Sequence, residues 1–264
     1  MSDHSAALTY TSYLELDDVL AAQHPRSDEH DEMLFIVIHQ VYELWFKQIL
    51  HELRHLQRAL AGEASTPHAV RTLRRTLTIL KVVVAQVDVL ETMTPRQFTG
   101  FRARLDASSG FQSAQFRELE AVLGRRDKRM LDTYPPDGEA WRRISDTMAS
   151  PSLLDSFLVY LAKHGYPVPA DLLDRDVREP HQPSEVVQDL LLRVYADDSG
   201  PATVAEHLVD LDEGLQEWRY RHVKMVERTI GGKPGTGGSS GAEYLRGTLF
   251  HPVFPDLWAV RSSL

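Results

Sequence analysis

Apolar residues recur at helical spacing along almost the whole chain, and this periodicity limits the fold more than any other feature. Side chains three and four positions apart share one face of a helix, so each such segment buries one stripe. The alternation of apolar and polar residues that marks a half-buried strand is missing from the sequence. The pattern predicts helices at 11–22, 29–61, 68–91, 95–105, 112–123, 137–147, 152–163, 184–196, 202–229 and 241–248.

Short stretches rich in turn-forming residues separate these segments, among them "AGEASTP", "DASSG" and "YPPDG". Helices joined by short connections pack as neighbours in a bundle. Because the chain has 264 residues and no long linker, we expect one all-α domain over 1–264, built on two or three long core helices.

Composition excludes several classes of function. The net charge of −9 disfavours binding to nucleic acid or to an anionic membrane surface. An apolar run of about 18–20 residues, as a membrane span requires, is absent, and the start "MSDHSAALTY" lacks the pattern of an export signal. We therefore expect a cytoplasmic protein. Cysteine is also absent, so a transition-metal site would have to use the 12 histidines together with carboxylates.

The segment 202–229 carries a histidine in an otherwise apolar stripe. At about 100° per residue, one narrow face holds Val204, Leu208, Leu211, Leu215, Trp218, His222, Val226 and Thr229. A buried imidazole is costly unless it finds a partner. His222 is thus either a core histidine bonded to a buried polar group, or a metal or haem ligand that projects into a bundle.

The segment 29–61 shows the same arrangement. Its buried face is predicted to hold Phe35, Ile38, His39, Tyr42, Phe46, Ile49 and Leu53. Two histidines on the inner faces of two long helices predict a site in which one histidine lies on each side of a shared cavity.

The stretch "HELRH", from His51 to His55, matches the H-E-x-x-H pattern of zinc peptidases. The two histidines would share one helix face, but that face also carries Lys47, Gln48 and Arg54 and lies away from the apolar stripe. The downstream histidine that would complete such a site is absent from the pattern. A solvated helix face is the better interpretation.

A glycine-rich loop, "GGKPGTGGSSG", follows the His222 segment at 231–241. It does not match a phosphate-binding P-loop, because Lys233 precedes the central glycines and a helix leads into the loop. Glycines on both sides of Thr236 would let the backbone come close to a ligand. We expect 231–241 to form a mobile lid over a site near His222.

Five stretches, taken in order, make the chain resemble the tryptophan 2,3-dioxygenases. They are "LTYTSYLELDDVLAAQHPRS" (8–27), "HDEMLFIVIHQVYELWFKQILHEL" (30–53), "LETMTPRQFTGFRARLDASSGFQSAQFRELE" (90–120), "WRYRHVKMVERTIGGKPGTGGSSGAEYLRGTL" (218–249) and "FPDLWAVR" (254–261). The middle, roughly 125–200, matches only loosely.

The resemblance implies an all-α haem enzyme that assembles as a homotetramer and uses haem b. Its substrates would be L-tryptophan and O2. It would insert both oxygen atoms across the C2–C3 bond of the indole ring, giving N-formylkynurenine, the first step of tryptophan catabolism by the kynurenine route.

The resemblance also implies roles for single residues. His222 matches the proximal ligand of the haem iron, and His39 matches the distal histidine that hydrogen-bonds the indole N–H. Arg102 matches the arginine that pairs with the substrate carboxylate, for which a planar guanidinium is well suited. Further matches to the substrate pocket are Phe35, Phe98, Leu105, Ser109 and Thr236, with Phe98 standing where some bacterial members have tyrosine.

The N-terminal residues Tyr10, Tyr13 and Leu14 match a segment that contacts the pocket of a neighbouring subunit. The resemblance therefore implies that 1–20 is an arm between subunits.

Two alternatives remain within haem chemistry. A related enzyme of the same fold could add one oxygen atom to an indole or act on a substituted tryptophan in a biosynthetic pathway, and the residues named above do not separate it from a dioxygenase. A haem sensor without turnover is disfavoured, because a sensor of a diatomic gas has no need of the carboxylate clamp formed by Arg102 and Thr236.

Overall fold

The computed structural model describes residues 7–106, 108–233, 235, 242–247 and 249–264. Every regular element in these ranges is helical, so the predicted all-α class is confirmed. The α-helices are α1 (Tyr10–Leu14), α2 (Leu16–Ala21), α3 (His30–Arg58), α4 (Thr66–Leu90), α5 (Pro95–Arg102), α6 (Ala114–Val122), α7 (Glu139–Met148), α8 (Leu153–Lys163), α9 (Ala170–Leu173), α10 (Glu185–Ala196), α11 (Gly200–Ile230), α12 (Ala242–Arg246) and α13 (Pro255–Ala259). Short π and 3-10 turns are η1 (Ala59–Glu63), η2 (Gly110–Gln112), η3 (Lys128–Leu131) and η4 (Val260–Ser263).

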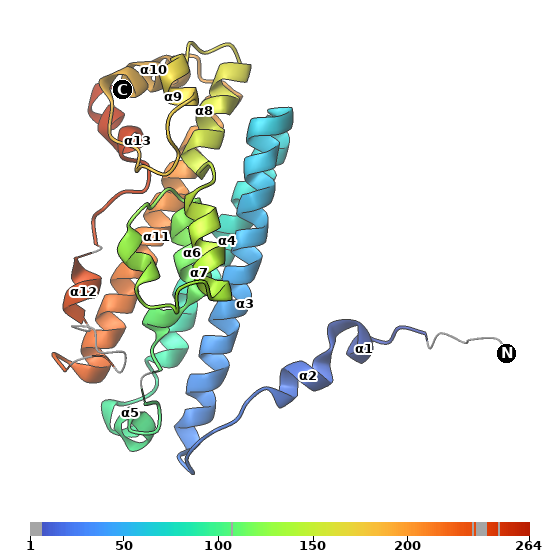
Figure 1. Cartoon of the computed structure of the whole chain (residues 1–264), viewed down its shortest axis with the longest axis vertical. Helices are drawn as coiled ribbons and strands as arrows, with labels where there is room; N and C mark the ends of the chain where they lie inside the picture. Colours follow the sequence, from blue (N-terminus) through green and yellow to red (C-terminus); the bar gives the residue numbers. More distant parts are fainter. Residues whose placement is uncertain (1–6, 107, 234, 236–241, 248) are drawn as a thin grey trace.

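Three long helices form the frame of the molecule. Helix α4 packs against both α3 and α11, and the shorter α6 packs against α3 (Figure 1). Helix α5 lies at one end of this frame, while α8, α10 and α13 gather at the other. None of the helices in the described part of the chain is long and apolar enough to cross a membrane.

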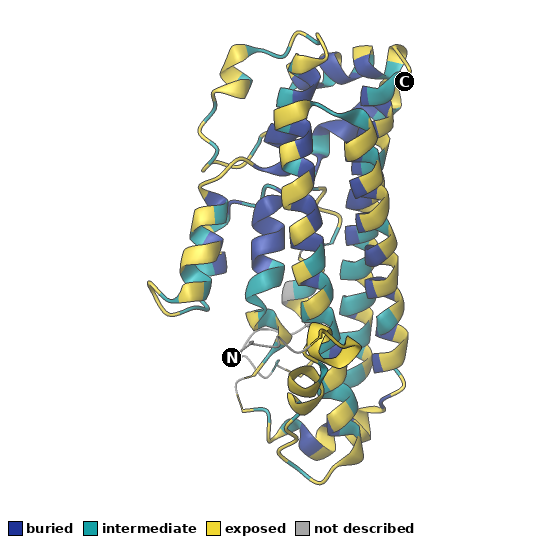
Figure 2. Ribbon diagram, turned by 90° about the vertical axis from the view of Figure 1, so that its right-hand side faces the viewer, coloured by how far each residue is buried: buried dark blue, intermediate teal, exposed yellow. Residues whose placement is uncertain are grey.

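The predicted stripes on α3 and α11 lie on the inside of the bundle. The first half of the α11 stripe, including Leu208 and Leu215, is packed into the main core, as is Leu53 at the far end of α3. Figure 2 shows buried and exposed positions alternating along the long helices. A smaller cluster with Phe98 and Phe101 closes the other end. Between these two clusters the stripes are only partly buried, because they line a cavity there.

The N-terminal arm differs from the predicted single helix over 11–22. It consists of α1 and α2, which Glu15 separates with a left-handed backbone (φ 49°). Figure 1 shows the arm leading away from the bundle. Its apolar side chains are open to solvent within one chain: Tyr10 is 76% exposed, Tyr13 72% and Leu14 40%.

The C-terminal segment contains α13, which the periodicity did not predict because five residues are too few to show it. A buried carboxylate holds this segment in place. Asp212 of α11 accepts hydrogen bonds from the backbone N–H groups of Val253 and Phe254 and from the indole N–H of Trp258. Helix α9 has four residues and is likewise too short for the periodicity to predict it.

Candidate functional site

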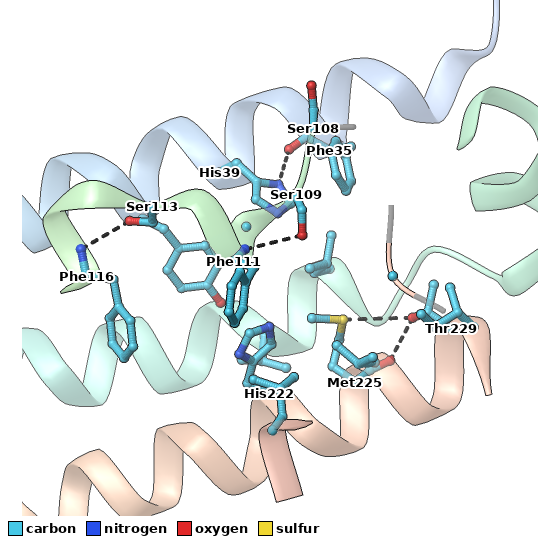
Figure 3. Close-up of a pocket in the computed structure, with 18 of the residues that line it drawn as sticks. Phe35, His39, Ser108, Ser109, Phe111, Ser113, Phe116, His222, Met225 and Thr229 are labelled. Carbon is cyan, nitrogen blue, oxygen red and sulfur yellow. Dashed lines mark hydrogen bonds between the residues drawn. The ribbon is translucent and has the colours of Figure 1, made fainter. Parts of the chain in front are cut away.

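One cavity of about 230 Å³ opens between α3, α4, α5, α6, α11 and the turn η2. Figure 3 shows His39 projecting into it from α3 and His222 from α11, on opposite sides. The predicted arrangement of two histidines facing one cavity is therefore present. The other lining residues from the predicted set are Phe35, Phe98, Arg102, Leu105 and Ser109.

The hydrogen-bonding state of His39 follows from its backbone partner. Its Nδ1 lies 2.7 Å from the carbonyl oxygen of Phe35, one turn earlier in α3. A carbonyl oxygen can only accept, so Nδ1 carries the hydrogen and Nε2 keeps its lone pair. Burial lowers the pKa of the His39 imidazole and so favours this neutral form. His39 is thereby an acceptor at Nε2.

His222 is also neutral. Burial first, and then electrostatic interactions with the His39 ring and with Arg117, lower the pKa of its imidazole to about 4. Among the residues that the structure describes, none hydrogen-bonds the ring, so the bonded core histidine considered from the sequence is not supported. The indole of Trp218 packs beside it, with ring centroids 5.0 Å apart. A neutral imidazole that lines a cavity without a polar partner is suited to ligate a metal.

A metal held by His222 would need its other ligands from a cofactor or from further side chains. Within the described ranges, no three histidine, aspartate or glutamate side chains come together as a metal-binding group. A site that offers one imidazole suits a metal that already carries most of its ligands, as haem iron does.

Aromatic rings and one arginine lie at the α5 end of the cavity. The ring of Phe35 packs against those of Phe98 and Phe101, at 5.8 Å and 5.5 Å between centroids. Arg102, the last residue of α5, lines the cavity next to this apolar cluster. This end therefore combines an apolar surface with a cation.

Ser109 lies at the start of η2, where its side chain accepts the backbone N–H of Phe111. Thr236 and most of the predicted lid fall outside the described residues. The residues Gly235 and Leu245, which flank that stretch, both line the cavity. Tyr10, Tyr13 and Leu14 do not line it within one chain, so their contact with a neighbouring subunit stays a prediction.

Four charged residues that the sequence analysis did not single out also line the cavity: Glu43, Arg117, Glu120 and Arg219. Charged residues on helices usually face solvent, and these were overlooked for that reason. Here Arg117 and Glu120 are 7% and 2% exposed. Arg117 and Glu120 lie three positions apart on the predicted 112–123 helix. This spacing allows an ion pair, and it is the feature of the sequence that could have identified them.

The "HELRH" stretch is a solvent-facing part of α3. His51 and His55 are exposed, whereas Glu52 is buried and accepts hydrogen bonds from Gln48 and Arg75. The glutamate thus points away from the two histidines and cannot serve a metal between them.

We expect the double substitution His51→Ala and His55→Ala to leave haem content and turnover within a few-fold of the unchanged protein. Elemental analysis of both proteins provides the measurement, with iron near one per chain and no stoichiometric zinc. Stoichiometric zinc that disappears in the double variant would reverse this interpretation.

The comparison with known proteins decides the family. The sequence profile described as "Tryptophan 2,3-dioxygenase" matches residues 1–164 and 181–264. This chain belongs to the tryptophan 2,3-dioxygenase family. The middle of the chain, where the resemblance is looser, falls outside the family match only at 165–180, and no cavity residue lies in that gap.

Curated relatives in this family match over nearly their whole length. The tryptophan 2,3-dioxygenase of Anaeromyxobacter dehalogenans is 67% identical, over 100% of this chain and 98% of its own. That of Herpetosiphon aurantiacus is 55% identical, over 98% of this chain and 100% of its own. That of Caulobacter vibrioides is 45% identical, over 97% of this chain and 98% of its own.

Proposed function

We propose that this chain is a haem-dependent dioxygenase that opens the indole ring of L-tryptophan with O2 and gives N-formylkynurenine. The observation that carries the proposal is the cavity: a neutral His222 with no hydrogen-bond partner among the described residues on one side, an acceptor His39 on the other, and Arg102 at one end. The relatives named for this activity are similar over the whole chain.

The residues of the cavity fit haem b. His222 would hold the iron through its neutral imidazole, and the mostly aromatic and aliphatic walls suit a flat apolar ring. When bound, haem supplies the chemistry that activates O2, and the protein supplies orientation and surroundings. The walls also exclude water from the reacting atoms.

His39 would position the indole ring. Its Nε2 can accept a hydrogen bond from the indole N–H because Nδ1 already donates to the Phe35 carbonyl. The ring of Phe35 packs against His39 at 4.1 Å between centroids and offers an apolar surface for the substrate. Together they select a ring that carries an N–H donor.

Arg102 would bind the carboxylate of the amino acid, since a guanidinium can donate two parallel hydrogen bonds to it. We assign Thr236 to the ammonium and carboxylate groups by family resemblance, and Phe98, Leu105 and Ser109 to the walls around the substrate. Fixing both ends of tryptophan would present C2 and C3 of the indole to the oxygen.

By family resemblance we assign the chain to a homotetramer in which the arm of one subunit completes the pocket of another. Its apolar residues Tyr10, Tyr13 and Leu14 are exposed within one chain, and burying them against a neighbour would stabilise the assembly.

We expect the affinity for L-tryptophan to stay constant between about pH 7.5 and 6.5 and to fall at lower pH. Burial lowers the pKa of His39, so its neutral form persists where an ordinary histidine is half protonated. Protonation below that lowered pKa removes the acceptor at Nε2. Binding titrations across this range measure the effect, and the affinity of the His39→Ala variant should not fall at low pH. A fall of equal size in that variant would show that another group titrates.

Purified protein loaded with haem tests the proposed function. Under air it should consume L-tryptophan and form N-formylkynurenine, and without O2 it should form none. A chain that binds haem but leaves L-tryptophan unchanged under air would contradict the proposal. The runner-up function, insertion of one oxygen atom, has no observation in its favour beyond the shared fold.

A further inference from the structure

An ion pair joins the end of α11 to α12, the short helix that follows the predicted lid at 231–241. Nε of Arg246 donates a hydrogen bond to Oε1 of Glu227 at 2.7 Å, and Nη2 of Arg246 lies at the same distance from that oxygen. The other carboxylate oxygen, Oε2, accepts a hydrogen bond from Nζ of Lys224 at 2.9 Å. One oxygen of Glu227 is thus bonded within α11, and the other holds α12.

The carboxylate is charged in this setting. Hydrogen bonds from Lys224 and Arg246 lower the pKa of the Glu227 carboxyl below its ordinary value. The side chain of Glu227 is 21% exposed, whereas those of Lys224 and Arg246 are 51% and 60% exposed. The pair therefore lies at the surface of the molecule, with the glutamate on its inner side.

The position of α12 depends on contacts of this kind. The helix has five residues, Ala242–Arg246, and a helix of this length does not persist alone in water. It packs against α11, next to which it is drawn in Figure 1. Between these two helices, the described residues form one ion pair, that of Glu227 with Arg246.

Helix α12 contributes to the wall of the cavity. Leu245, the residue before Arg246, is partly buried and lines the cavity between His39 and His222. On α11, Val226 lines the same cavity directly before Glu227. Glu227 and Arg246 do not line it themselves. They can act on a bound molecule only through the wall residues beside them.

We propose that Glu227 and Arg246 are positioning residues for the substrate: their ion pair keeps α12 on α11 and so holds Leu245 in the cavity wall before L-tryptophan binds. This inference rests on the proposed use of L-tryptophan as substrate. Without the pair, fewer molecules have a complete wall, and the apparent affinity falls with that fraction. Turnover at saturating L-tryptophan stays nearly constant, because the bound substrate favours the complete wall.

Arg246→Glu is the first test, since it replaces an attraction by a repulsion. The Michaelis constant of the haem-loaded protein for L-tryptophan should rise about three- to ten-fold, with kcat within about two-fold. The exchanged pair, Glu227→Arg with Arg246→Glu, restores opposite charges and should bring the Michaelis constant back to within about two-fold. An unchanged Michaelis constant in Arg246→Glu, or no recovery in the exchanged pair, would overturn the inference.

Lys224→Gln is the matched control. Lys224 bonds to the same carboxylate but lies within α11 and does not reach α12. Its Michaelis constant should therefore stay within about two-fold of that of the unchanged protein. A rise as large as that of Arg246→Glu would mean that charge at the end of α11 matters in general, and would contradict a specific contact with α12.

Hydrogen exchange over 242–247 measures the position of α12 without any reaction. The N–H of Gly247 bonds to the carbonyl oxygen of Glu243 at 3.2 Å, and such a bond protects an amide only while the helix is formed. Exchange should be about three- to ten-fold faster in Arg246→Glu than in the unchanged protein or Lys224→Gln.

The outcomes separate the two proposals. Equal exchange rates and equal Michaelis constants in proteins that all convert L-tryptophan refute the role of the ion pair alone. An unchanged protein that does not convert L-tryptophan refutes the proposed function, and with it the role of the pair in substrate binding, whatever the exchange rates are.

Discussion

Alanine at position 222 is expected to remove most of the haem from the purified protein and to abolish the spectrum of histidine-ligated iron. The imidazole of His222 is the group in the described part of the cavity that is placed and neutral for this role, with a pKa lowered to about 4 by burial. His39, on the opposite wall, donates through Nδ1 to the Phe35 carbonyl and is assigned to the substrate. Haem content per chain and the absorption spectrum of the ferrous protein provide the measurements.

The matched control for this variant is His207→Ala. His207 lies in the same helix and its Nδ1 bonds to the carbonyl of Thr203, one turn earlier, away from the cavity. It should retain haem at the level of the unchanged protein. Normal haem content and an unchanged spectrum in His222→Ala would show that another residue holds the iron.

Alanine at position 102 is expected to raise the Michaelis constant for L-tryptophan by about 10- to 100-fold. The reason is loss of a charge-assisted contact with the substrate carboxylate, worth roughly 1.5–3 kcal/mol. Steady-state kinetics of the haem-loaded protein measure the effect. The neighbouring exposed Arg104, which does not line the cavity, gives the control variant Arg104→Ala, and its Michaelis constant should stay within two- to three-fold.

A substrate without the carboxylate sharpens this prediction. Tryptamine should already bind poorly to the unchanged protein, and Arg102→Ala should weaken it little further, because the contact is absent in both cases. A loss for tryptamine as large as that for L-tryptophan would mean that Arg102 supports the cavity and does not contact the carboxylate.

The inner faces of the long helices could be predicted from periodicity. The stripe through Leu208, Leu215 and His222 is buried in the first half of α11 and lines the cavity in the second. Period and apolar character place a histidine inside the bundle, but they do not show whether the space beside it is filled. Only the packing of α3, α4 and α11 together reveals the cavity.

Buried charge could not be predicted in the same way. Arg117 and Glu120 have the composition of a solvated helix face, yet both are buried, and Glu120 also bonds to Arg219 of α11, 99 residues away. Such a group exists only once the tertiary structure brings its members together. Sequence pattern reports local periodicity and carries little information about such distant partners.

The break in the N-terminal arm was unpredictable for a related reason. The apolar spacing of 11–22 continues through Glu15, yet its left-handed backbone divides the segment into α1 and α2. Within one chain the arm has few packing partners, and tertiary packing normally decides whether a short helix persists. Of the residues assigned by family resemblance, the structure brings Phe35, His39 and Arg102 to one cavity, because α3 and α5 hold them there.

The most direct test of the account is the mass of the product formed from L-tryptophan under isotopically labelled O2. The haem-loaded protein is predicted to give N-formylkynurenine carrying two labelled oxygen atoms from one O2 molecule. A product that carries a single labelled atom on an intact indole would contradict the account and establish the monooxygenase alternative.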